Sequence, residues 1–241
     1  MSTIVIVGAG PQLGFAIGAK FAEKGGFNVA LVARSEAQLA AVVDRFRRAG
    51  MSAAAFPVDV TDRPSLGKAL AAAEEHFGSI DVLEYSPAPT LPDLADRPLV
   101  SAVDLTVEAV VPELETYFFG AIAAVRQVLP GMIERGAGTI IGTSGAGSGP
   151  MVVPQVANAN VANAAMRNWL LALNQSVAGR GVHVAHVALG ARIGSGRPNS
   201  EPDVIADLYW KAHVERDAPE IFHYDLPEAD EFQLADKFRT G

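Results

Sequence analysis

Short apolar runs alternate with longer amphipathic stretches along almost the whole chain. The apolar runs predict strands at Ile4–Val7, Val29–Ala33, Ala53–Phe56, Ile80–Leu83, Thr139–Gly142 and Val182–Ala188, with an edge strand at Ile221–His223. The longer stretches predict helices at Leu13–Glu23, Glu36–Ala49, Ser65–Phe77, Glu113–Arg135, Asn158–Ala178 and Asp203–Val214. A strand followed by a helix, repeated, is typical of βαβ units, whose strands pair in parallel. The pattern therefore predicts an α/β fold around a doubly wound parallel sheet.

Three segments break this alternation. Four prolines after the fourth strand predict a loop that continues neither a helix nor a strand: Pro87, Pro89, Pro92 and Pro98. Gly190 to Pro202 predicts a flexible connection, at the end of the sheet where doubly wound folds place their ligand. The polar residues from Pro227 onward are expected to pack loosely or to cover an oligomer surface.

Composition narrows the class of protein. The 241 residues fit one domain spanning 1–241, and with 49% hydrophobic but only 7% aromatic residues they suit strands buried on both faces. The chain has no cysteine, which excludes disulfides and thiolate chemistry and is compatible with the cytoplasm. A net charge of −8 disfavours nucleic-acid partners. Gly, Pro or charge interrupts every apolar run, and the first residues predict a strand rather than a signal peptide, so no membrane partner is expected.

A glycine-rich turn follows the first predicted strand directly: Gly8-Ala9-Gly10-Pro11-Gln12-Leu13-Gly14. Glycines allow the sharp turn and let the backbone amides at a helix N-terminus approach a pyrophosphate. A glycine turn alone is weak evidence, but its place between a buried strand and an amphipathic helix makes it specific. The sequence therefore predicts a dinucleotide site at this turn.

The end of the second strand bears on which dinucleotide binds. Ala33 offers no carboxylate for a ribose 2′-hydroxyl, whereas Arg34 can pair with a 2′-phosphate and Ser35 can add a hydroxyl. An arginine at a helix N-terminus opposes the helix macrodipole, which indicates an anionic partner, so NADP(H) is favoured over NAD(H). Asp59, followed by Val60, either meets the adenine or is a capping or turn carboxylate.

These blocks, together with Ile80-Asp81-Val82-Leu83, Leu129-Pro130-Gly131-Met132 and Gly138-Thr139-Ile140-Ile141, resemble the short-chain dehydrogenase/reductase family from about Ile4 to about Leu189. The resemblance implies a Rossmann-type parallel sheet of about seven strands with helices on both faces. It also implies NAD(P)(H) as the hydride carrier and a homodimer or homotetramer.

The chain departs from the family in its glycine motif and in the block after the fourth strand. Val7 replaces the family threonine and Gln12 the middle glycine, while Gly8 and Gly14 are kept. Gln12 adds bulk beside the pyrophosphate, although its amide can also donate to a phosphate oxygen. The Asn-Asn-Ala-Gly block becomes Tyr85-Ser86-Pro87-Ala88, so its contacts to the central sheet are not expected.

The resemblance places the family's catalytic tyrosine at Ala159, its lysine at Asn163 and its asparagine at Tyr117. The family serine falls at Ser144 or Gly145, and only Ser144 keeps a hydroxyl. Alanine supplies neither proton nor charge to a carbonyl oxygen, so the usual mechanism does not transfer. Asn163 can still hydrogen-bond the nicotinamide ribose.

One hypothesis makes Tyr117 the proton donor and Ser144 the donor to the substrate oxygen. The alternative, which we favour, is that Tyr117 fills volume beside Phe118 and Phe119. Tyr85 is a second possible donor with an equally plain packing role. His183 and His186 lie three apart on a predicted strand and point to opposite faces, so they do not share a metal, and no metal site is predicted.

Three functions stay open at this point. The first is an NADP(H)-dependent oxidoreductase acting on a small carbonyl or alcohol by a non-standard mechanism. The second is a noncatalytic NADP(H)-binding protein or sensor that has no small-molecule substrate. The third is a structural subunit that pairs with a catalytically complete relative.

Overall fold

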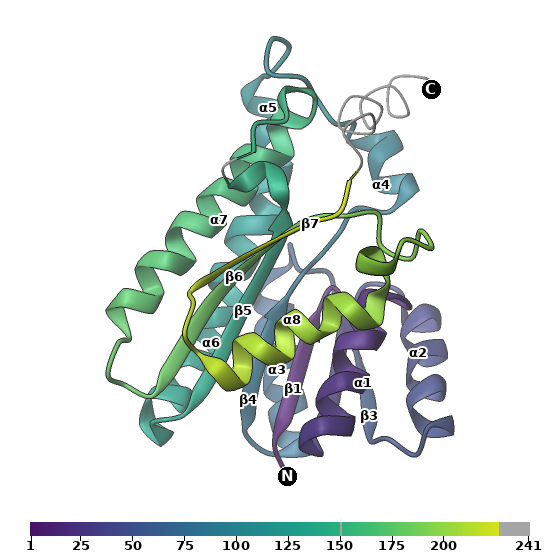
Figure 1. Ribbon diagram of the computed structural model, residues 1–241, viewed down its shortest axis with the longest axis vertical. Helices are drawn as coiled ribbons and strands as arrows, with labels where there is room; N and C mark the ends of the chain where they lie inside the picture. The colour runs from purple at the N-terminus through teal and green to yellow at the C-terminus, as the bar shows by residue number, and fades with distance from the viewer. Residues whose placement is uncertain (150, 227–241) are drawn as a thin grey trace.

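The computed structural model describes residues 1–149 and 151–226, which form a seven-stranded, all-parallel sheet in the order β3-β2-β1-β4-β5-β6-β7 (Figure 1). The strands are β1 Thr3–Val7, β2 Asn28–Ala33, β3 Ala53–Pro57, β4 Ile80–Tyr85, β5 Gly138–Gly145, β6 Val182–Gly190 and β7 Glu220–Tyr224. The strand order reverses between β1 and β4, and ligands of such sheets bind outside the carboxyl ends of the strands at that point. The segment from Pro227 onward lies outside the described residues.

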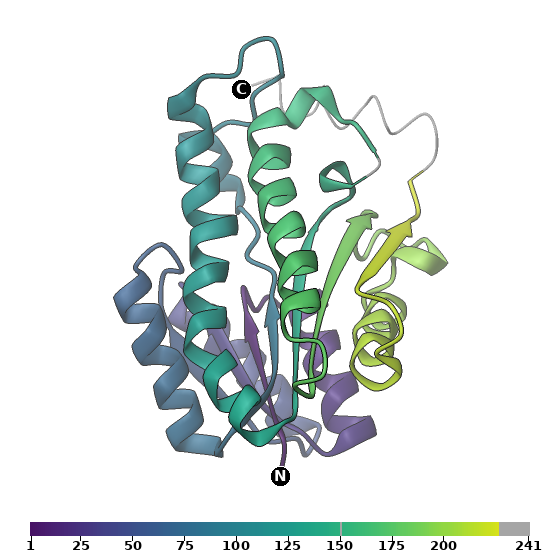
Figure 2. The ribbon, with the colours of Figure 1, turned by 90° about the vertical axis from the view of Figure 1, so that its left-hand side faces the viewer.

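Helices cover both faces of the sheet, as Figure 2 shows from the side. One face packs on α1 Leu13–Gly25, α2 Glu36–Arg48 and α8 Pro202–Glu215. The other face packs on α3 Arg63–Phe77, α6 Gly120–Arg135 and α7 Ala157–Ser176. Each face of the sheet forms its own hydrophobic core: the α6–α7 core under α3, α6 and α7, and the α1–α8 core under α1, α2 and α8. Successive strand residues alternate between them, so Ile140 lies in the α6–α7 core and Ile141 in the α1–α8 core. The predicted Rossmann-type fold is confirmed.

The prediction of an uninterrupted loop after the fourth strand is wrong, because a short helix, α4 Leu91–Asp96, forms there. Thr90 accepts a hydrogen bond from the Asp93 amide and the Asp93 carboxylate accepts one from the Thr90 amide, which is a capping box. Pro92 fits because the first turn of a helix needs no amide donor there.

The fourth long helix begins earlier than predicted. It starts as α5 Val107–Glu113, capped by the Thr106 hydroxyl, and continues through a π-helical segment, η1 Leu114–Phe119, into α6. π-Helical turns inside α-helices are frequent at functional sites. Tyr117 lies in this segment.

The connection after β6 is hydrogen-bonded to the residue that follows β7. It contains a single 3-10 turn, η4 Pro198–Ser200, and the carboxylate of Asp225 accepts hydrogen bonds from Arg197 and Ser200. Asp225 lies just beyond β7, far along the chain, so the local sequence carried no signal for these contacts; the flexibility of the connection stays a prediction. Two more short turns, η2 Ala146–Ser148 and η3 Pro154–Val156, follow β5.

Residues Val107–Arg135 form one helical stretch whose length and composition would suffice to cross a membrane. This is weak evidence, since the core helix of a protein with no membrane contact passes the same test. The α6 part of the stretch buries Ala124, Val128 and Met132 against the sheet, which accounts for its apolar character.

Candidate active site

The glycine turn joins β1 to α1 at the point where the strand order reverses. Gly8 has a φ of 94° and donates its amide hydrogen to the Val32 carbonyl at 2.8 Å. A Cβ atom on Gly8 would lie 2.5 Å from backbone atoms of Ser86 and Pro87, at the end of β4. On Gly14 it would lie 3.1 Å from the Ala9 Cα. The packing of the turn therefore requires a glycine at Gly8, whereas at Gly14 an added methyl would make a tight contact with Ala9.

Gly10 differs from these two, because a Cβ added there would meet no atom of the described residues within 4 Å. The first amides of α1, which begins at Leu13, have no partner within the helix. The Phe15 amide donates to the Gly10 carbonyl, and the Gln12 side chain caps none of them. Gln12 instead lies beside Gly194, where a Cβ would stand 3.0 Å from its Nε2 atom. Open space in front of helix amides is the arrangement that accepts an anion.

Arg34 already has an anionic partner in the protein. Its two terminal nitrogens donate to the two carboxylate oxygens of Asp93 at 2.7 and 2.5 Å. Hydrogen bonds from Arg34 hold the pKa of Asp93 well below its usual range. Asp93 also lies 3.8 Å from Arg97, so one carboxylate stands between two guanidinium groups. Arg34 was predicted to pair with an anion, the 2′-phosphate of NADP(H). In the structure its anionic partner is the Asp93 carboxylate.

The remaining residues predicted at the adenosine end have local structural roles. Ser35 caps α2 by accepting a hydrogen bond from the Gln38 amide. Asp59 accepts bonds from the amide and hydroxyl of Thr61 at 2.8 and 2.7 Å, so it is a turn carboxylate, the second of its two proposed roles. Val60 is buried in the α6–α7 core. Contact of Asp59 with adenine stays a prediction.

The two positions that lack the expected acid and ammonium lie on α7. Ala159 supplies no polar group, and the Asn163 side chain is buried with its residue only 6% exposed. The Oδ1 atom of Asn163 has no hydrogen-bond partner among the described residues. A buried acceptor without a donor costs free energy, so a ligand hydroxyl at this point would satisfy it.

Neither tyrosine considered as a proton donor is poised to act as an acid. The Tyr85 hydroxyl donates to the Thr116 carbonyl at 2.5 Å, so its proton is engaged in a hydrogen bond within the protein and not directed at a substrate. Burial raises the pKa of Tyr117, and the negative charge of Glu113 raises it further. Efficient general acids have a pKa near the working pH, which is the opposite tendency.

Ser144 belongs to a line of buried hydrogen bonds that sequence reasoning missed. Its Oγ lies 2.6 Å from the Ser148 Oγ and 2.7 Å from the Nε2 atom of His186. The Nδ1 atom of His186 lies 3.0 Å from the Glu220 carboxylate, which also accepts two hydrogen bonds from Arg167. The residues come from β5, η2, β6, β7 and α7, and the sequence carried no local signal for their meeting.

A second buried network lies on the opposite face of the sheet. Glu84 on β4 is fully buried and accepts hydrogen bonds from Ser86 and Thr143, both at 2.8 Å. The Thr143 hydroxyl also lies 2.9 Å from the Tyr209 hydroxyl. Burial raises the pKa of Glu84 to about 7, although both hydrogen bonds oppose the shift.

Comparison with known proteins decides the family. The model of the short chain dehydrogenase family matches residues 2–194, from β1 to the connection after β6. The chain belongs to the short-chain dehydrogenase family.

Relatives of this short-chain dehydrogenase include the ketoacyl reductase HetN of Nostoc sp., 28% identical over 189 residues, which are 78% of this chain and 62% of the relative. A putative ketoacyl reductase of Streptomyces coelicolor is 30% identical over 152 residues, 62% of this chain and 55% of the relative. The chain thus spans little more than half the length of these two relatives.

Solved structures share the fold of this short-chain dehydrogenase. A metagenomic short-chain oxidoreductase in complex with NADP superposes with a TM-score of 0.77, at 20% identity and over 94% of this chain and 98% of that one. The L-sorbose reductase of Gluconobacter frateurii, complexed with NADPH and L-sorbose, gives 0.76 at 20% identity, over 92% and 95% of the two chains.

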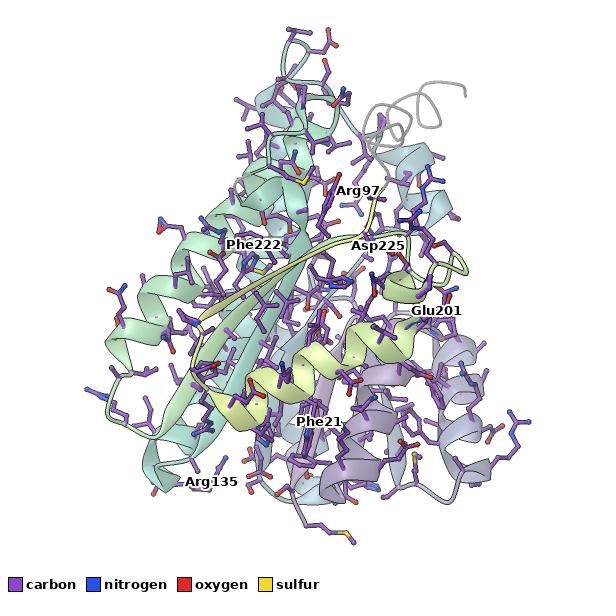
Figure 3. The ribbon with its side chains drawn as sticks, in the orientation of Figure 1. Phe21, Arg97, Arg135, Glu201, Phe222 and Asp225 are labelled. Carbon is purple, nitrogen blue, oxygen red and sulfur yellow. The ribbon has the colours of Figure 1, made fainter. Side chains whose placement is uncertain are left out.

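This short-chain dehydrogenase has a pocket of about 410 Å³ at the carboxyl ends of its last three strands. It is lined mainly by apolar side chains: Ala146, Met151, Val152, Ala188, Phe222, His223 and Tyr224. Ala188 pairs in register with Ser144, which places the serine next to the pocket. Phe222, labelled in Figure 3, lines the pocket from β7. A larger groove of about 900 Å³ between α3 and α6 contains none of the predicted site residues.

The residues of this short-chain dehydrogenase fit a nicotinamide dinucleotide at three separate points. Gly10 leaves open space at the helix amides for a pyrophosphate. Asn163 holds an acceptor for which residues 1–149 and 151–226 supply no donor, and a ribose hydroxyl would supply one. The Arg34 guanidinium makes bidentate hydrogen bonds to a carboxylate, and a phosphate group can accept the same pair of bonds.

Proposed function

We propose that this protein is an NADP(H)-dependent oxidoreductase that interconverts a small, largely apolar carbonyl compound and its alcohol. The observation that carries the proposal is the buried Asn163 Oδ1, which has no hydrogen-bond partner in the described part of the chain, on the helix that follows the strand of Ser144. Family membership supports hydride chemistry, and two curated relatives bear the name ketoacyl reductase. The apolar pocket beside Ser144 supports an apolar substrate body.

Each proposed role follows from the chemistry of the side chain. The amides at the start of α1 would bind the pyrophosphate, Arg34 the 2′-phosphate and Asn163 the ribose beside the nicotinamide. When bound, the cofactor supplies or accepts the hydride. Ser144 donates a hydrogen bond to the substrate oxygen, where negative charge develops during reduction. The pocket walls exclude water and hold the apolar part of the substrate.

The Arg34–Asp93 ion pair gives the first test. The 2′-phosphate of NADP(H) must replace the Asp93 carboxylate at the Arg34 guanidinium, whereas NADH has no group that competes. Arg34→Ala is therefore expected to weaken NADPH binding roughly tenfold to a hundredfold, and Asp93→Asn to strengthen it up to about fivefold. Titration calorimetry measures both, with NADH as the control. Equal effects on NADPH and NADH would contradict the assignment of Arg34.

The substrate-oxygen role of Ser144 gives the second test. Ser144→Ala is expected to lower kcat for NADPH-dependent carbonyl reduction about 100-fold, because a donor to the developing oxyanion is lost. Tyr117→Phe is expected to keep most of the activity, since Tyr117 has a raised pKa and faces Glu113. Stopped-flow absorbance at the NADPH band measures both. Loss of reduction in Tyr117→Phe with full activity in Ser144→Ala would restore the tyrosine as the donor.

A further inference from the structure

A continuous line of hydrogen bonds runs from the pocket to the edge of the sheet beneath α7. Ser144, His186 and Glu220 lie on neighbouring strands, and His186 pairs directly with Glu220 in the β6–β7 register. Side chains of paired residues on one sheet face stand next to each other, which accounts for the 3.0 Å contact between His186 Nδ1 and Glu220. The order serine, imidazole, carboxylate results from the sheet register, with distances of 2.7 and 3.0 Å.

The direction of each hydrogen bond follows from the charges around His186. Three groups contact or face its ring in the described part of the chain: Ser144 from β5, Glu220 from β7 and Arg167 from α7. The Glu220 carboxylate is held ionised by Arg167, since burial alone would raise the pKa of Glu220 but its hydrogen bonds to Arg167 and His186 lower it overall. An ionised carboxylate only accepts, so Nδ1 of His186 carries a proton and donates it to Glu220.

This arrangement leaves the other nitrogen of His186 for Ser144. In neutral His186, Nε2 is an acceptor, and the Ser144 hydroxyl donates to it at 2.7 Å; the Gly145 carbonyl is a more distant acceptor at 3.2 Å. In protonated His186, Nε2 carries a proton as well and donates to the Ser144 oxygen. The serine hydroxyl then donates to another acceptor, either the Ser148 oxygen at 2.6 Å or a substrate oxygen.

The pocket lies at the serine end of this line. Ala188, one of its lining residues, is the register partner of Ser144, and Ala146 follows Ser144 by two residues. The imidazole itself is fully buried, with 0% of its side chain exposed. Ser144 is therefore the member of the line through which a molecule in the pocket would exchange a proton with His186.

We propose that Ser144, His186 and Glu220 form a proton relay that serves carbonyl reduction in place of the absent tyrosine and lysine. The proposal rests on the proposed function for its reductant, a reduced nicotinamide nucleotide. Ser144 is the catalytic residue, because it touches the substrate oxygen. His186 and Glu220 act through it as positioning and proton-holding residues.

The relay balances in protons and electrons. Hydride addition to the carbonyl carbon forms a C–H bond and moves the C=O π pair onto oxygen, while the reduced nicotinamide nucleotide is oxidised. That oxygen takes the proton of the Ser144 hydroxyl, and the Ser144 oxygen takes the Nε2 proton of the His186 imidazolium. His186 ends neutral, with its Nδ1 proton still donated to Glu220. Alcohol oxidation runs the same transfers backward.

The relay predicts a pH dependence with a definite sign. Burial lowers the pKa of His186, Glu220 raises it and Arg167 lowers it. Reduction needs the protonated imidazole, so its rate is expected to rise as the pH falls toward this lowered pKa, and oxidation is expected to show the reverse. Glu220→Gln should move both profiles to lower pH, because the anion is lost. Arg167→Gln should move them to higher pH, because the cation is lost.

The experiment combines NMR of the protein with histidines labelled with 15N and stopped-flow kinetics with NADPH and a panel of apolar ketones. NMR is expected to give the Nδ1–H tautomer for neutral His186 and a midpoint that moves in opposite directions in Glu220→Gln and Arg167→Gln. His186→Gln is expected to lower kcat about 100-fold and to flatten the pH profile, without changing the dissociation constant for NADPH. His183→Gln is the matched control on the same strand; its Nε2 atom has no partner among the described residues.

Each outcome separates the relay from the function on which it rests. An Nε2–H tautomer, or a midpoint insensitive to both substitutions, overturns the relay without any reference to turnover. Wild-type turnover with the same pH profile in His186→Gln overturns the relay and leaves the proposed function standing. Absence of wild-type turnover with every ketone overturns the proposed function, and the relay with it.

Discussion

Gly8→Ala is expected to lower the free energy of unfolding by about 3 kcal/mol and to abolish measurable nucleotide binding. Alanine at a φ of 94° is strained by roughly 1–2 kcal/mol, and the added methyl would overlap the backbone of Ser86 and Pro87 at 2.5 Å. Backbone cannot rotate away as a side chain can, so relieving the overlap separates β1 from β4 at the site. Chemical denaturation and calorimetric titration with NADPH measure the two effects.

Gly10→Ala is the matched control for this prediction. Its new methyl would meet no atom within 4 Å in the part of the chain that the structure describes, so the free energy of unfolding should stay within about 0.5 kcal/mol of wild type. The same methyl would occupy the space assigned to the pyrophosphate, and binding of NADPH should weaken strongly. Unchanged binding in Gly10→Ala would show that the nucleotide does not use this turn. Unchanged stability in Gly8→Ala would contradict the described packing of β1 on β4.

Glu84→Gln is expected to stabilise the protein at pH 8 and to have little effect at pH 5. The pKa of Glu84 is about 7 in the folded protein, and the ordinary value for the unfolded chain is 4.5. Below pH 4.5 the group is protonated in both states, and between 4.5 and 7 the folded protein binds more protons. Stability from this group is therefore present at low pH and is lost as the pH rises through 7.

The size of the effect follows from the shift. At 1.36 kcal/mol per pKa unit, ionised Glu84 costs about 3 kcal/mol above pH 7, which corresponds to a rise in Tm on the order of 5–10 °C for Glu84→Gln at pH 8. Thermal unfolding at both pH values measures it, with Glu134→Gln, at an exposed position of α6, as the control for loss of one surface charge. A Glu84→Gln protein that is less stable than wild type at pH 8 would mean that the buried carboxylate is stabilised by its hydroxyl partners.

The order and type of the long elements were predictable because each carries its own periodicity. The sequence placed β1, which leads into the glycine turn, and β5, which contains Ser144, within a few residues of their observed ends. α4 was missed because four prolines outweighed a local signal, the threonine and aspartate of a capping box at Thr90 and Asp93. The early start of the helix at Val107 was missed because Pro112 lies inside it.

The site was predictable only where its residues are close in the sequence. Gly8, Gly10 and Gly14 lie within one turn, so their shared role follows from spacing. The partner of Arg34 lies 59 residues away, and its identity depends on how α4 folds back. Ser144 and His186 are 42 residues apart, and His186 and Glu220 are 34 apart. Their contact depends on the register of three parallel strands, which one sequence does not specify.

Calorimetric titration of the wild-type protein with NADPH, NADP+, NADH and NAD+ tests the central claim most directly. We expect saturable binding of all four dinucleotides, at one site per chain, with the two phosphorylated forms bound more tightly because Arg34 exchanges Asp93 for the 2′-phosphate. If none of the four dinucleotides binds, the account is contradicted. The open space at Gly10 and the Asn163 acceptor, which has no partner among the described residues, would then not belong to a dinucleotide site.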